Sequence, residues 1–310
     1  METFHPLDQH CFNGRPDYRF EKLIGSGSFG SVYKAYSIQN NLAVAIKRSA
    51  KSGSLVSREY KILKETASSE NCVRLLDIFY SITEDGKYIQ HLVFEYLPEN
   101  LSRFIRNRKR AHHPLDHAEI CSIFKQILQG LQFIHGKNIL HRDLKPENVL
   151  IDPITMKVKL CDFGSAKIQT DKNTPFIVSR YYRAPELIFC NCKYGSEIDI
   201  WAAGCIFLEL FLGSPVFLGK NEGNQFIQQA NILGPPSLSD IIRLTENTQI
   251  KPKIAAKAIK IGKKQNILEF LRRSPKANEA LDLIQNMLSW DPTKRPSATE
   301  CLNHPFFDVC

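Results

Sequence analysis

The sequence lacks the features that mark membrane proteins, secreted scaffolds and repeat proteins. Its 310 residues contain no apolar run of eighteen or more, so we expect no transmembrane helix. Met1–Gln9 lacks the basic-then-apolar pattern of a secretory leader, and neither end carries a lipidation motif. No internal repeat, low-complexity tract or linker is present. These absences favour a globular protein with one large domain or two lobes.

A disulfide framework is also missing from the sequence. The nine cysteines are an odd number and follow no repeating spacing. This favours reduced thiols, and with them a cytoplasmic or nuclear location. Cys190 and Cys192 resemble half of a metal site, but no matching pair follows them, so we interpret both as incidental.

Acidic residues are outnumbered by basic ones, and the formal net charge is +9. Nucleic-acid binding is one interpretation, but acidic or phosphorylated protein substrates explain the charge equally well. The basic residues are mostly dispersed. One cluster, in Leu101–His113, fits a nuclear-import or nucleic-acid patch, but we favour a solvated helix face and loop. Its basic residues are Arg103, Arg106, Arg108, Lys109 and Arg110, and the nearby histidines, expected to face solvent, are His112, His113 and His117.

The hydrophobic periodicity changes near Pro98. Before it, apolar residues alternate as in strands, with one helical stretch at about Leu55–Glu65. Beyond it the spacing is helical, most clearly at 120–131 and 200–212. The five predicted strands are Tyr18–Ile24, Ser31–Ser37, Leu42–Lys47, Arg74–Tyr80 and Tyr88–Glu95. The pattern predicts an α+β protein: an extension at 1–17, a strand-rich lobe at 18–95, a hinge at 95–98 and a larger helical lobe at 99–307.

The string His-Arg-Asp-Leu-Lys-Pro-Glu-Asn at His141–Asn148 resembles the catalytic loop of protein kinases. In such a loop Asp143 accepts the proton of a substrate hydroxyl, Lys145 neutralises charge on the transferring phosphoryl group, and Asn148 holds magnesium. Phosphoryl transfer needs positioning and charge neutralisation more than covalent help from the protein. The sequence therefore predicts catalysis centred on this loop.

A glycine-rich segment, Gly25–Val32, precedes this loop by more than a hundred residues. Glycines at the spacing G-x-G-x-x-G let backbone amides close over phosphates. Dinucleotide-binding folds share this spacing, but their glycines join a strand to a helix. Here strand-like residues lie on both sides, which favours a kinase-type hairpin over the phosphates of ATP.

A predicted strand ends in Lys47, and Glu59 follows twelve residues later in the predicted helix. Such a pair can meet and position the α- and β-phosphates of ATP. Further along, Leu92–Pro98 is an apolar strand that turns polar. Its place between the lobes predicts a hinge whose backbone binds adenine, with Phe94 closing the back of the pocket.

Asp162-Phe163-Gly164 follows the catalytic loop and predicts a second magnesium-binding group, Asp162. Gly164 is expected to allow the turn there, and Phe163 to pack against the helix that carries Glu59. Three further residues have expected scaffold roles: Glu186 and Arg295 as a buried ion pair, and Asp199 as a brace for the catalytic loop.

Taken together, residues 18–307 resemble a eukaryotic protein kinase, motif by motif and in order. This resemblance implies a small antiparallel sheet with one main helix, a larger helical lobe, and the cofactors ATP and Mg²⁺. Lys145 is typical of serine/threonine kinases. The residues that the resemblance assigns to ATP are Ile24, Gly25, Ser26, Gly27, Ser28, Phe29, Gly30, Ser31, Val32, Ala45, Lys47, Phe94, Glu95, Tyr96, Leu97, Leu150 and Cys161.

Two strings, Lys159–Lys167 and Ser179–Phe189, resemble glycogen synthase kinase 3 within the group of cyclin-dependent, MAP and glycogen synthase kinases. In that family three basic residues bind a phosphate already present on the substrate, four residues after the target hydroxyl. The matching positions here are Arg58, Arg142 and Lys167. The resemblance implies protein substrates that are already phosphorylated. The alternative is that these residues bind a phosphate on the kinase's own loop.

The sequence also departs from the family. Phe176 replaces the activation-loop tyrosine, the loop is two residues shorter, and 246–264 is lysine-rich, so the family's partner docking is not carried over. Phe94 and Glu95 resemble a cyclin-dependent kinase hinge, which leaves an enzyme with an activating subunit as one alternative. A pseudokinase scaffold is another, although none of Lys47, Asp143, Asn148 and Asp162 is missing. We expect no membrane partner.

Overall fold

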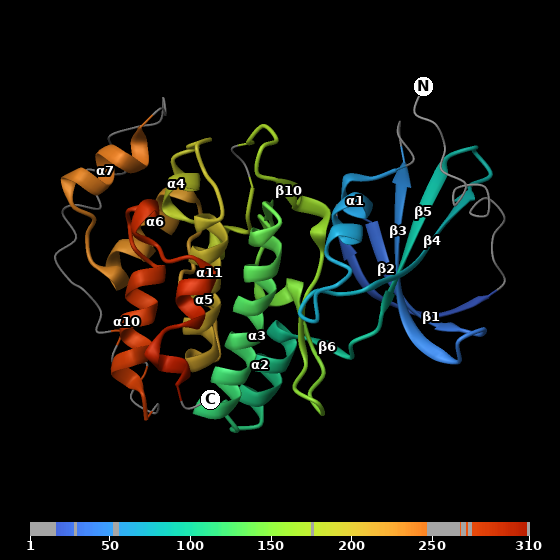
Figure 1. The fold of residues 1–310 in the computed structure, drawn as a ribbon, viewed down its shortest axis with the longest axis horizontal. Coiled ribbons are helices and arrows are strands. Elements are labelled where there is room, and N and C mark those ends of the chain that lie inside the picture. Colours follow the sequence, from blue (N-terminus) through green and yellow to red (C-terminus); the bar gives the residue numbers. More distant parts are fainter. Residues whose placement is uncertain are drawn as a thin grey trace. The chain divides into compact units, whose positions relative to one another are not determined.

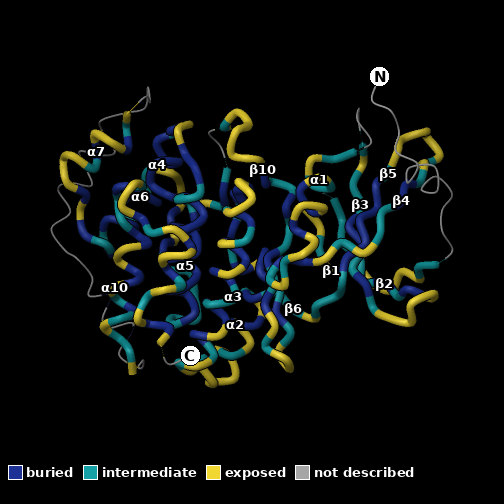
Figure 2. Tube along the Cα trace, in the orientation of Figure 1, coloured by how far each residue is buried: buried dark blue, intermediate teal, exposed yellow. Residues whose placement is uncertain are grey.

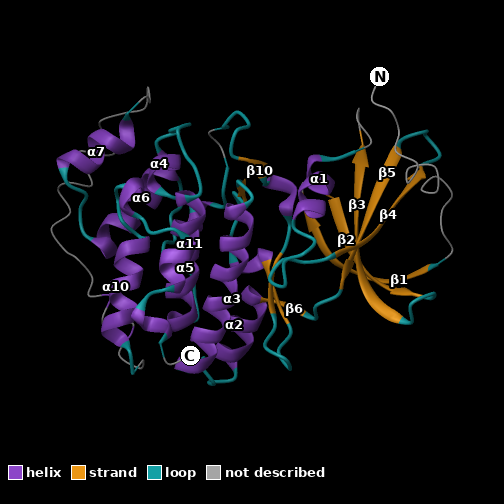
Figure 3. Cartoon of the chain, in the orientation of Figure 1, coloured by secondary structure: helices purple, strands orange, loops and turns teal. Residues whose placement is uncertain are grey.

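The computed structural model describes residues 17–27, 30–51, 56–174, 177–246, 267, 271 and 275–308. The chain divides into two compact units, Met1–Leu97 and Pro98–Cys310. The first unit is built mainly of strands and the second mainly of helices (Figure 3). The predicted α+β class is confirmed.

The first unit is organised around one antiparallel sheet of five strands (Figure 1). Their order is β1-β2-β3-β5-β4, so only the last two exchange places relative to the sequence. Ala35, Val44, Ile46, Phe79 and Val93 pack as the apolar core of this sheet. The strands are β1 (Tyr18–Gly27), β2 (Gly30–Ser37), β3 (Leu42–Lys51), β4 (Leu75–Ile82) and β5 (Tyr88–Glu95).

The helix of the first unit, α1 (Arg58–Glu65), carries the predicted Glu59. It begins where the side chain of Ser57 accepts a hydrogen bond from the Tyr60 amide, which satisfies one of the unpaired donors of the first turn. Ile62 and Leu63 form its buried face. The predicted start at Leu55 lies outside the described residues.

The second unit is built around two long helices, α3 (His117–Gly136) and α5 (Glu197–Leu212). Asp116 and Glu119 form a capping box that fixes the start of α3. From Ile198 to Leu210 every residue of α5 is buried, so this helix is the central element of the unit (Figure 2). The other α-helices described are α2 (Leu101–Arg110), α4 (Pro185–Ile188), α6 (Glu222–Leu233), α7 (Leu238–Thr245), α10 (Ala277–Met287) and α11 (Ala298–Leu302).

Short strands and 3₁₀ turns of the second unit position the segment from 139 to 182. β7 pairs with β10, and β8 lies between β6 and β9. The strands are β6 (Glu99–Asn100), β7 (Ile139–Leu140), β8 (Val149–Ile151), β9 (Val158–Leu160) and β10 (Lys167–Ile168). The turns are η2 (Pro146–Asn148), η3 (Phe163–Ser165), η4 (Arg180–Tyr182), η5 (Pro292–Lys294) and η6 (Pro305–Phe307).

Two expectations about the whole chain can be compared with the structure. In its described part, no helix combines the length and apolar character that crossing a membrane requires. Free cysteines are found at Cys72, Cys161, Cys190, Cys192, Cys205 and Cys301. Cys121 on α3 is disulfide-bonded, so the expectation of reduced thiols is wrong at that position.

Candidate active site

The predicted catalytic loop follows β7, and its first two residues are hydrogen-bonded to Asp199 of α5. The two carboxylate oxygens of Asp199 accept hydrogen bonds from the backbone amides of His141 (2.8 Å) and Arg142 (2.9 Å). The ring of His135 contacts the same carboxylate at 3.0 Å. Burial opposes ionisation of Asp199, but these hydrogen bonds and the nearby histidines outweigh it and lower its pKa. The loop therefore sits on a buried, ionised brace.

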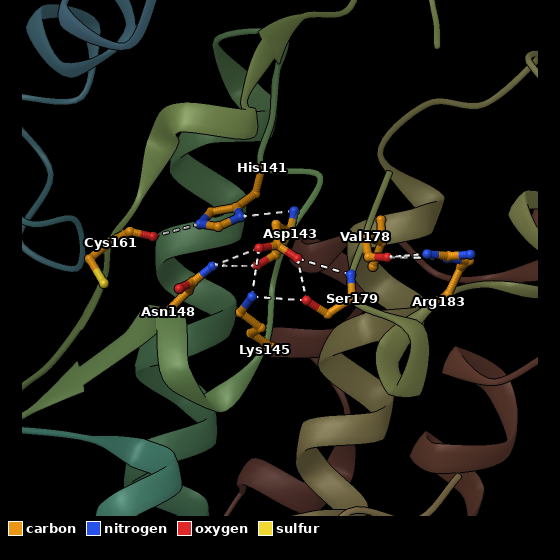
Figure 4. A network of polar contacts seen from close by, with 8 residues as sticks. All are labelled: His141, Asp143, Lys145, Asn148, Cys161, Val178, Ser179 and Arg183. Atoms are coloured by element: carbon orange, nitrogen blue, oxygen red, sulfur yellow. Dashed lines mark hydrogen bonds and ion pairs between the residues drawn. The ribbon is translucent and has the colours of Figure 1, made fainter. Parts of the chain in front are cut away.

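Asp143 is the centre of a polar network in this loop (Figure 4). Its Oδ1 accepts hydrogen bonds from the Ser179 amide (3.0 Å) and hydroxyl (2.9 Å). Its Oδ2 accepts from Lys145 Nζ at 2.8 Å and from Asn148 Nδ2 at 3.1 Å. The side chain keeps 15% of its surface exposed, so a hydroxyl group can still reach it. The network fixes the carboxylate without closing it off, as a proton acceptor requires.

The predicted magnesium residues, Asn148 and Asp162, lie at the same end of the β8–β9 hairpin. Val149 pairs with Leu160, and the Cys161 amide donates to the Asn148 carbonyl at 2.9 Å, which brings Asp162 next to Asn148. The side-chain nitrogen of Asn148 faces Asp143, and its side-chain oxygen points away from that residue (Figure 4).

This pair fits Mg²⁺ chemically, because carboxylate and amide oxygens are its usual protein ligands. Within the described residues no three His, Cys, Asp or Glu side chains form a metal-binding group. Such a sparse set suits Mg²⁺, which is commonly held by one or two protein oxygens together with water and substrate phosphates.

Asp162 also makes the turn that leads into η3. Its backbone is left-handed, with φ 59° and ψ 69°, a conformation that asparagine and aspartate tolerate better than most residues. Gly164 was expected to allow this turn. It lies inside η3 and is not among the glycines with positive φ, so the left-handed position of this turn is Asp162, and the expected role of Gly164 stays a prediction. Phe163 is fully buried, with its ring 5.3 Å from that of His141. Its expected packing against the Glu59 helix joins the two units and stays a prediction.

In the first unit, Lys47 and Glu59 meet as the sequence predicts. Lys47 Nζ lies 2.8 Å from Glu59 Oε1, and the two side chains are 9% and 12% exposed. Lys47 is carried by β3 and Glu59 by the first turn of α1. A largely buried ion pair of this kind holds the Lys47 ammonium in one place, where it can attract phosphate oxygens.

The glycine-rich segment forms the end of the β1–β2 hairpin. Gly27 pairs with Gly30, and Gly25 with Val32. Gly30 has φ +118°, and a Cβ there would lie 2.1 Å from the Arg48 carbonyl oxygen, so only glycine fits. Ser28 and Phe29 lie outside the described residues. Other members of the predicted ATP set on this hairpin, all on described backbone, are Ile24, Ser26 and Ser31.

The other residues predicted to bind ATP belong partly to the first unit and partly to the second. Ala45 on β3 pairs with Phe94 on β5, whose side chain is 8% exposed. Glu95 ends β5, and the first unit ends two residues later with Tyr96 and Leu97; all three residues are partly exposed. Leu150 and Cys161, both half-buried, belong to the second unit. A common adenine site formed by these residues stays a prediction.

The three basic residues predicted to hold a substrate phosphate differ in their surroundings. Arg58 is exposed on α1 in the first unit. Arg142 is buried, and its guanidinium donates to the Ser165 carbonyl (2.7 Å), the Thr174 hydroxyl (3.3 Å) and the Tyr194 hydroxyl (3.1 Å). Lys167 is 1% exposed, and its Nζ donates to the carbonyls of Gln169 and Asp171. Arg142 and Lys167 therefore both contact the segment 165–174, Arg142 at its two ends and Lys167 at Gln169 and Asp171.

Sequence reasoning gave Ser179 no role of its own, although it lies in a string used for the resemblance. Its hydroxyl also accepts a hydrogen bond from Lys145 Nζ at 2.8 Å, so it links the two central groups of the site. One residue earlier, Val178 has φ 66°, a rare conformation for a β-branched residue. Arg183 holds the Val178 carbonyl through two hydrogen bonds, at 3.1 and 2.8 Å. No local sequence signal indicates this strained backbone.

The predicted scaffold pair forms a two-pronged ion pair in the second unit. Arg295 Nη1 and Nη2 lie 2.6 and 2.8 Å from the two oxygens of Glu186, and both side chains are almost fully buried. The guanidinium also lies 4.9 Å from the Trp201 ring centre and donates to the Glu197 carbonyl at 3.1 Å. This contact anchors α4 to the start of α5.

Two of the three histidines after α2, His112 and His113, are exposed as expected. His117 is not, because its ring packs edge-on against Phe306 at 5.2 Å and burial lowers its pKa. The expectation that it faces solvent is wrong. It begins α3, where the C-terminal turn η6 covers it.

Comparison with known proteins agrees with this arrangement. The description "Protein kinase domain" belongs to the family model that matches residues 18–307. The chain is also 37% identical over 300 residues to "Protein kinase gsk3" of Schizosaccharomyces pombe, an alignment that covers 94% of this chain and 74% of that protein. The resemblance inferred from the motifs is confirmed. The chain belongs to the protein kinase family and is a protein serine/threonine kinase that resembles glycogen synthase kinase 3.

Proposed function

We propose that this kinase transfers the γ-phosphoryl group of ATP to serine or threonine hydroxyls of proteins that already carry a phosphate. Asp143 accepts the proton of the attacking hydroxyl, and Lys145 neutralises charge on the phosphoryl group. Lys47, held by Glu59, binds the α- and β-phosphates. Asn148 and Asp162 would hold Mg²⁺, which neutralises phosphate charge when it is bound. The observation that carries the proposal is the Asp143 carboxylate, fixed by four hydrogen bonds yet open to a hydroxyl.

The preference for phosphorylated substrates rests on Arg142. Its guanidinium is buried, yet its partners among the described residues are all neutral: one carbonyl and two hydroxyl groups. A buried cation without a carboxylate partner is unfavourable by itself and attracts an anion. A dianionic phosphate matches the planar guanidinium in both charge and geometry. The neutral partners can yield to it with little loss.

One observation favours a second candidate for the phosphate. The exposed Thr174 places its hydroxyl on Arg142 at 3.3 Å. A phosphoryl group added to Thr174 would meet the same guanidinium within the chain. In that case the anion belongs to the kinase itself and orders its loop, and the substrate needs no phosphate of its own.

The test compares kcat/KM for two peptides of the form Ser-x-x-x-Ser, one with phosphate on the second serine. We expect the phosphorylated peptide to be preferred by about tenfold or more, because one charge-assisted contact contributes about 1.5–3 kcal/mol. Arg58 is the exposed member of the three basic residues predicted to bind this phosphate. Replacing Arg58→Ala should therefore reduce the preference and leave kcat/KM for the unphosphorylated peptide unchanged.

Thr174→Val separates the two candidates for the phosphate. The variant keeps the preference for the phosphorylated peptide if the substrate supplies the phosphate. Equal use of both peptides by the wild type, together with loss of activity in Thr174→Val, would contradict the proposal and assign the phosphate to the loop.

A further inference from the structure

A pocket at the end of α2 has no part in the site described above. Its volume is about 320 Å³, and it lies where the last turn of α2 and the loop 112–115 meet the last turn of α5. α5 runs from Asp199, which braces the catalytic loop, to Leu212 at the pocket. At 1.5 Å per residue this separation is about 20 Å, too far for the pocket to hold the reacting hydroxyl.

One wall of the pocket is apolar. Ile105 and Leu210 form its floor and are 3% and 2% exposed, while Leu115, Phe211 and Leu212 are half-buried at its sides. A pocket of this size and lining suits one large apolar side chain with its neighbouring backbone.

The other wall is basic, and no aspartate or glutamate lines the pocket. Arg108 is already neutralised, because its Nη2 lies 2.6 Å from Glu119 Oε2 and its Nε donates to the His113 carbonyl. Lys109 is different. It is exposed and, among the described residues, its ammonium group makes no ion pair or hydrogen bond. His112 beside it is also exposed.

The wall is held in a fixed shape. The bond from Arg108 to the His113 carbonyl ties α2 to the loop, and the bond to Glu119 ties it to α3. On the opposite side Gly213 has φ +67°, and a Cβ there would lie 3.2 Å from Lys109 Cδ. The lysine stem therefore lies along the end of α5 while its ammonium remains free to contact a partner.

We propose that this pocket docks a protein segment in which a large apolar side chain is flanked by acidic residues. The apolar side chain enters between α2 and α5, and its acidic neighbours pair with the Lys109 ammonium at the rim of the pocket. Nucleic acid fits less well, because half of the lining is apolar and the most enclosed arginine is already paired with Glu119. The inference is independent of the preference for phosphorylated substrates.

The segment would be found about six or more residues from the phosphorylated serine or threonine of a substrate, because an extended chain covers about 3.3 Å per residue. The contact raises the local concentration of the substrate without touching the reacting groups.

The experiment measures fluorescence anisotropy of a labelled peptide, Asp-Glu-Phe-Asp-Glu, with the full-length chain. Two further peptides separate the contributions: Asp-Glu-Ala-Asp-Glu lacks the apolar side chain, and Lys-Lys-Phe-Lys-Lys reverses the charge. The variants are Lys109→Glu, the conservative Lys109→Arg, and Lys294→Glu as a matched control. Lys294 is an exposed lysine next to Arg295, which contacts Glu197 at the opposite end of α5.

We expect saturable binding of the first peptide, weakened about tenfold or more by Lys109→Glu and by Phe→Ala in the peptide. Lys109→Arg and Lys294→Glu should keep the wild-type affinity, and the reversed-charge peptide should not bind. Equal affinity for Lys109→Glu and the wild type, or no binding of the peptide, would overturn the proposal. So would displacement of the peptide by a short DNA duplex whose own binding depends on Lys109. Because binding is measured without ATP, failure here is distinct from failure of the kinase assay.

Discussion

At the scale of single residues, the site depends on how one carboxylate is held. Asp143 has two oxygens, and each accepts two hydrogen bonds, one pair from Ser179 and the other from Lys145 and Asn148. Ser179 comes from the segment before η4 and not from the loop, so it connects two parts of the chain that are 36 residues apart. Its hydroxyl contacts both the Asp143 carboxylate and the Lys145 ammonium and so fixes their positions relative to each other.

Replacing Ser179→Ala should lower kcat about tenfold or more while changing the KM for ATP little, because it removes positioning and leaves Asp143 in place. Ser179→Thr keeps the hydroxyl group and should retain most of the activity. Steady-state kinetics of both variants checks this. Equal kcat values for the alanine variant and the wild type would show that the contact has no catalytic importance.

At the scale of elements, the sequence predicted the strands and the helix of the first unit well, because alternation of apolar residues decides them. It missed how far β1 and β3 extend, since their ends carry glycine, serine and lysine that give no periodic signal. The motifs identified Asp143, Asn148 and Asp162. They could not predict the left-handed backbones of Asp162 and Val178, which depend on contacts made by distant residues such as Arg183.

Packing at the element scale also explains the error at His117. A histidine at the start of a helix, directly after Asp116 and three residues after Pro114, has the local sequence of an exposed position. Phe306, 189 positions further along the chain, covers it. No local pattern in the sequence contains that information.

The β1–β2 hairpin offers a prediction about Gly30. An alanine there would bring its Cβ to 2.1 Å from the Arg48 carbonyl at a φ of +118°. We expect Gly30→Ala to lower the free energy of unfolding of this unit by about 2 kcal/mol or more. Gly27→Ala is the matched control, because no atom lies within 4 Å of a Cβ at that position. It should cost less than about 1 kcal/mol. Urea denaturation of both variants measures the difference, and equal midpoints would contradict the account.

At the scale of the whole molecule, the buried helix α5 links the catalytic loop, the scaffold ion pair and the segment before α4. Asp199, Glu197 and Glu209 of this helix contact, in turn, the loop backbone, Arg295 and Tyr182. Glu209 is 3% exposed and accepts a hydrogen bond from the Tyr182 hydroxyl at 2.7 Å. Burial and, to a smaller extent, the charge of Glu147 raise the pKa of Glu209 to about 7, although the hydrogen bond from Tyr182 opposes them in part.

This shift predicts how stability depends on pH. Below pH 4.5, the ordinary pKa of glutamate, the carboxyl is protonated in both the folded and unfolded states, and its contribution to stability is fully present. As the pH rises through about 7 the folded protein must ionise a buried group, and that contribution is lost. The difference between 4.5 and about 7 corresponds to about 3 kcal/mol.

Glu209→Gln keeps an oxygen for Tyr182 but does not titrate. Relative to this variant, the wild type should lose up to about 3 kcal/mol of unfolding free energy between pH 4.5 and about pH 8, with no further change above. Denaturation curves across this range test it. Parallel pH profiles of the two proteins would show that Glu209 does not titrate in the folded state as described.

The central claim is that Asp143 serves as the proton acceptor in transfer of the γ-phosphoryl group of ATP. The most direct measurement is the rate at which [γ-³²P]ATP labels a phosphorylated Ser-x-x-x-Ser peptide with Mg²⁺ present, for the wild type and for Asp143→Asn. Asparagine keeps the size of the side chain and one oxygen but cannot take the proton. We predict that kcat falls by about 10²–10⁴ while the KM for ATP changes little. An Asp143→Asn variant that labels the peptide at the wild-type rate would contradict the account.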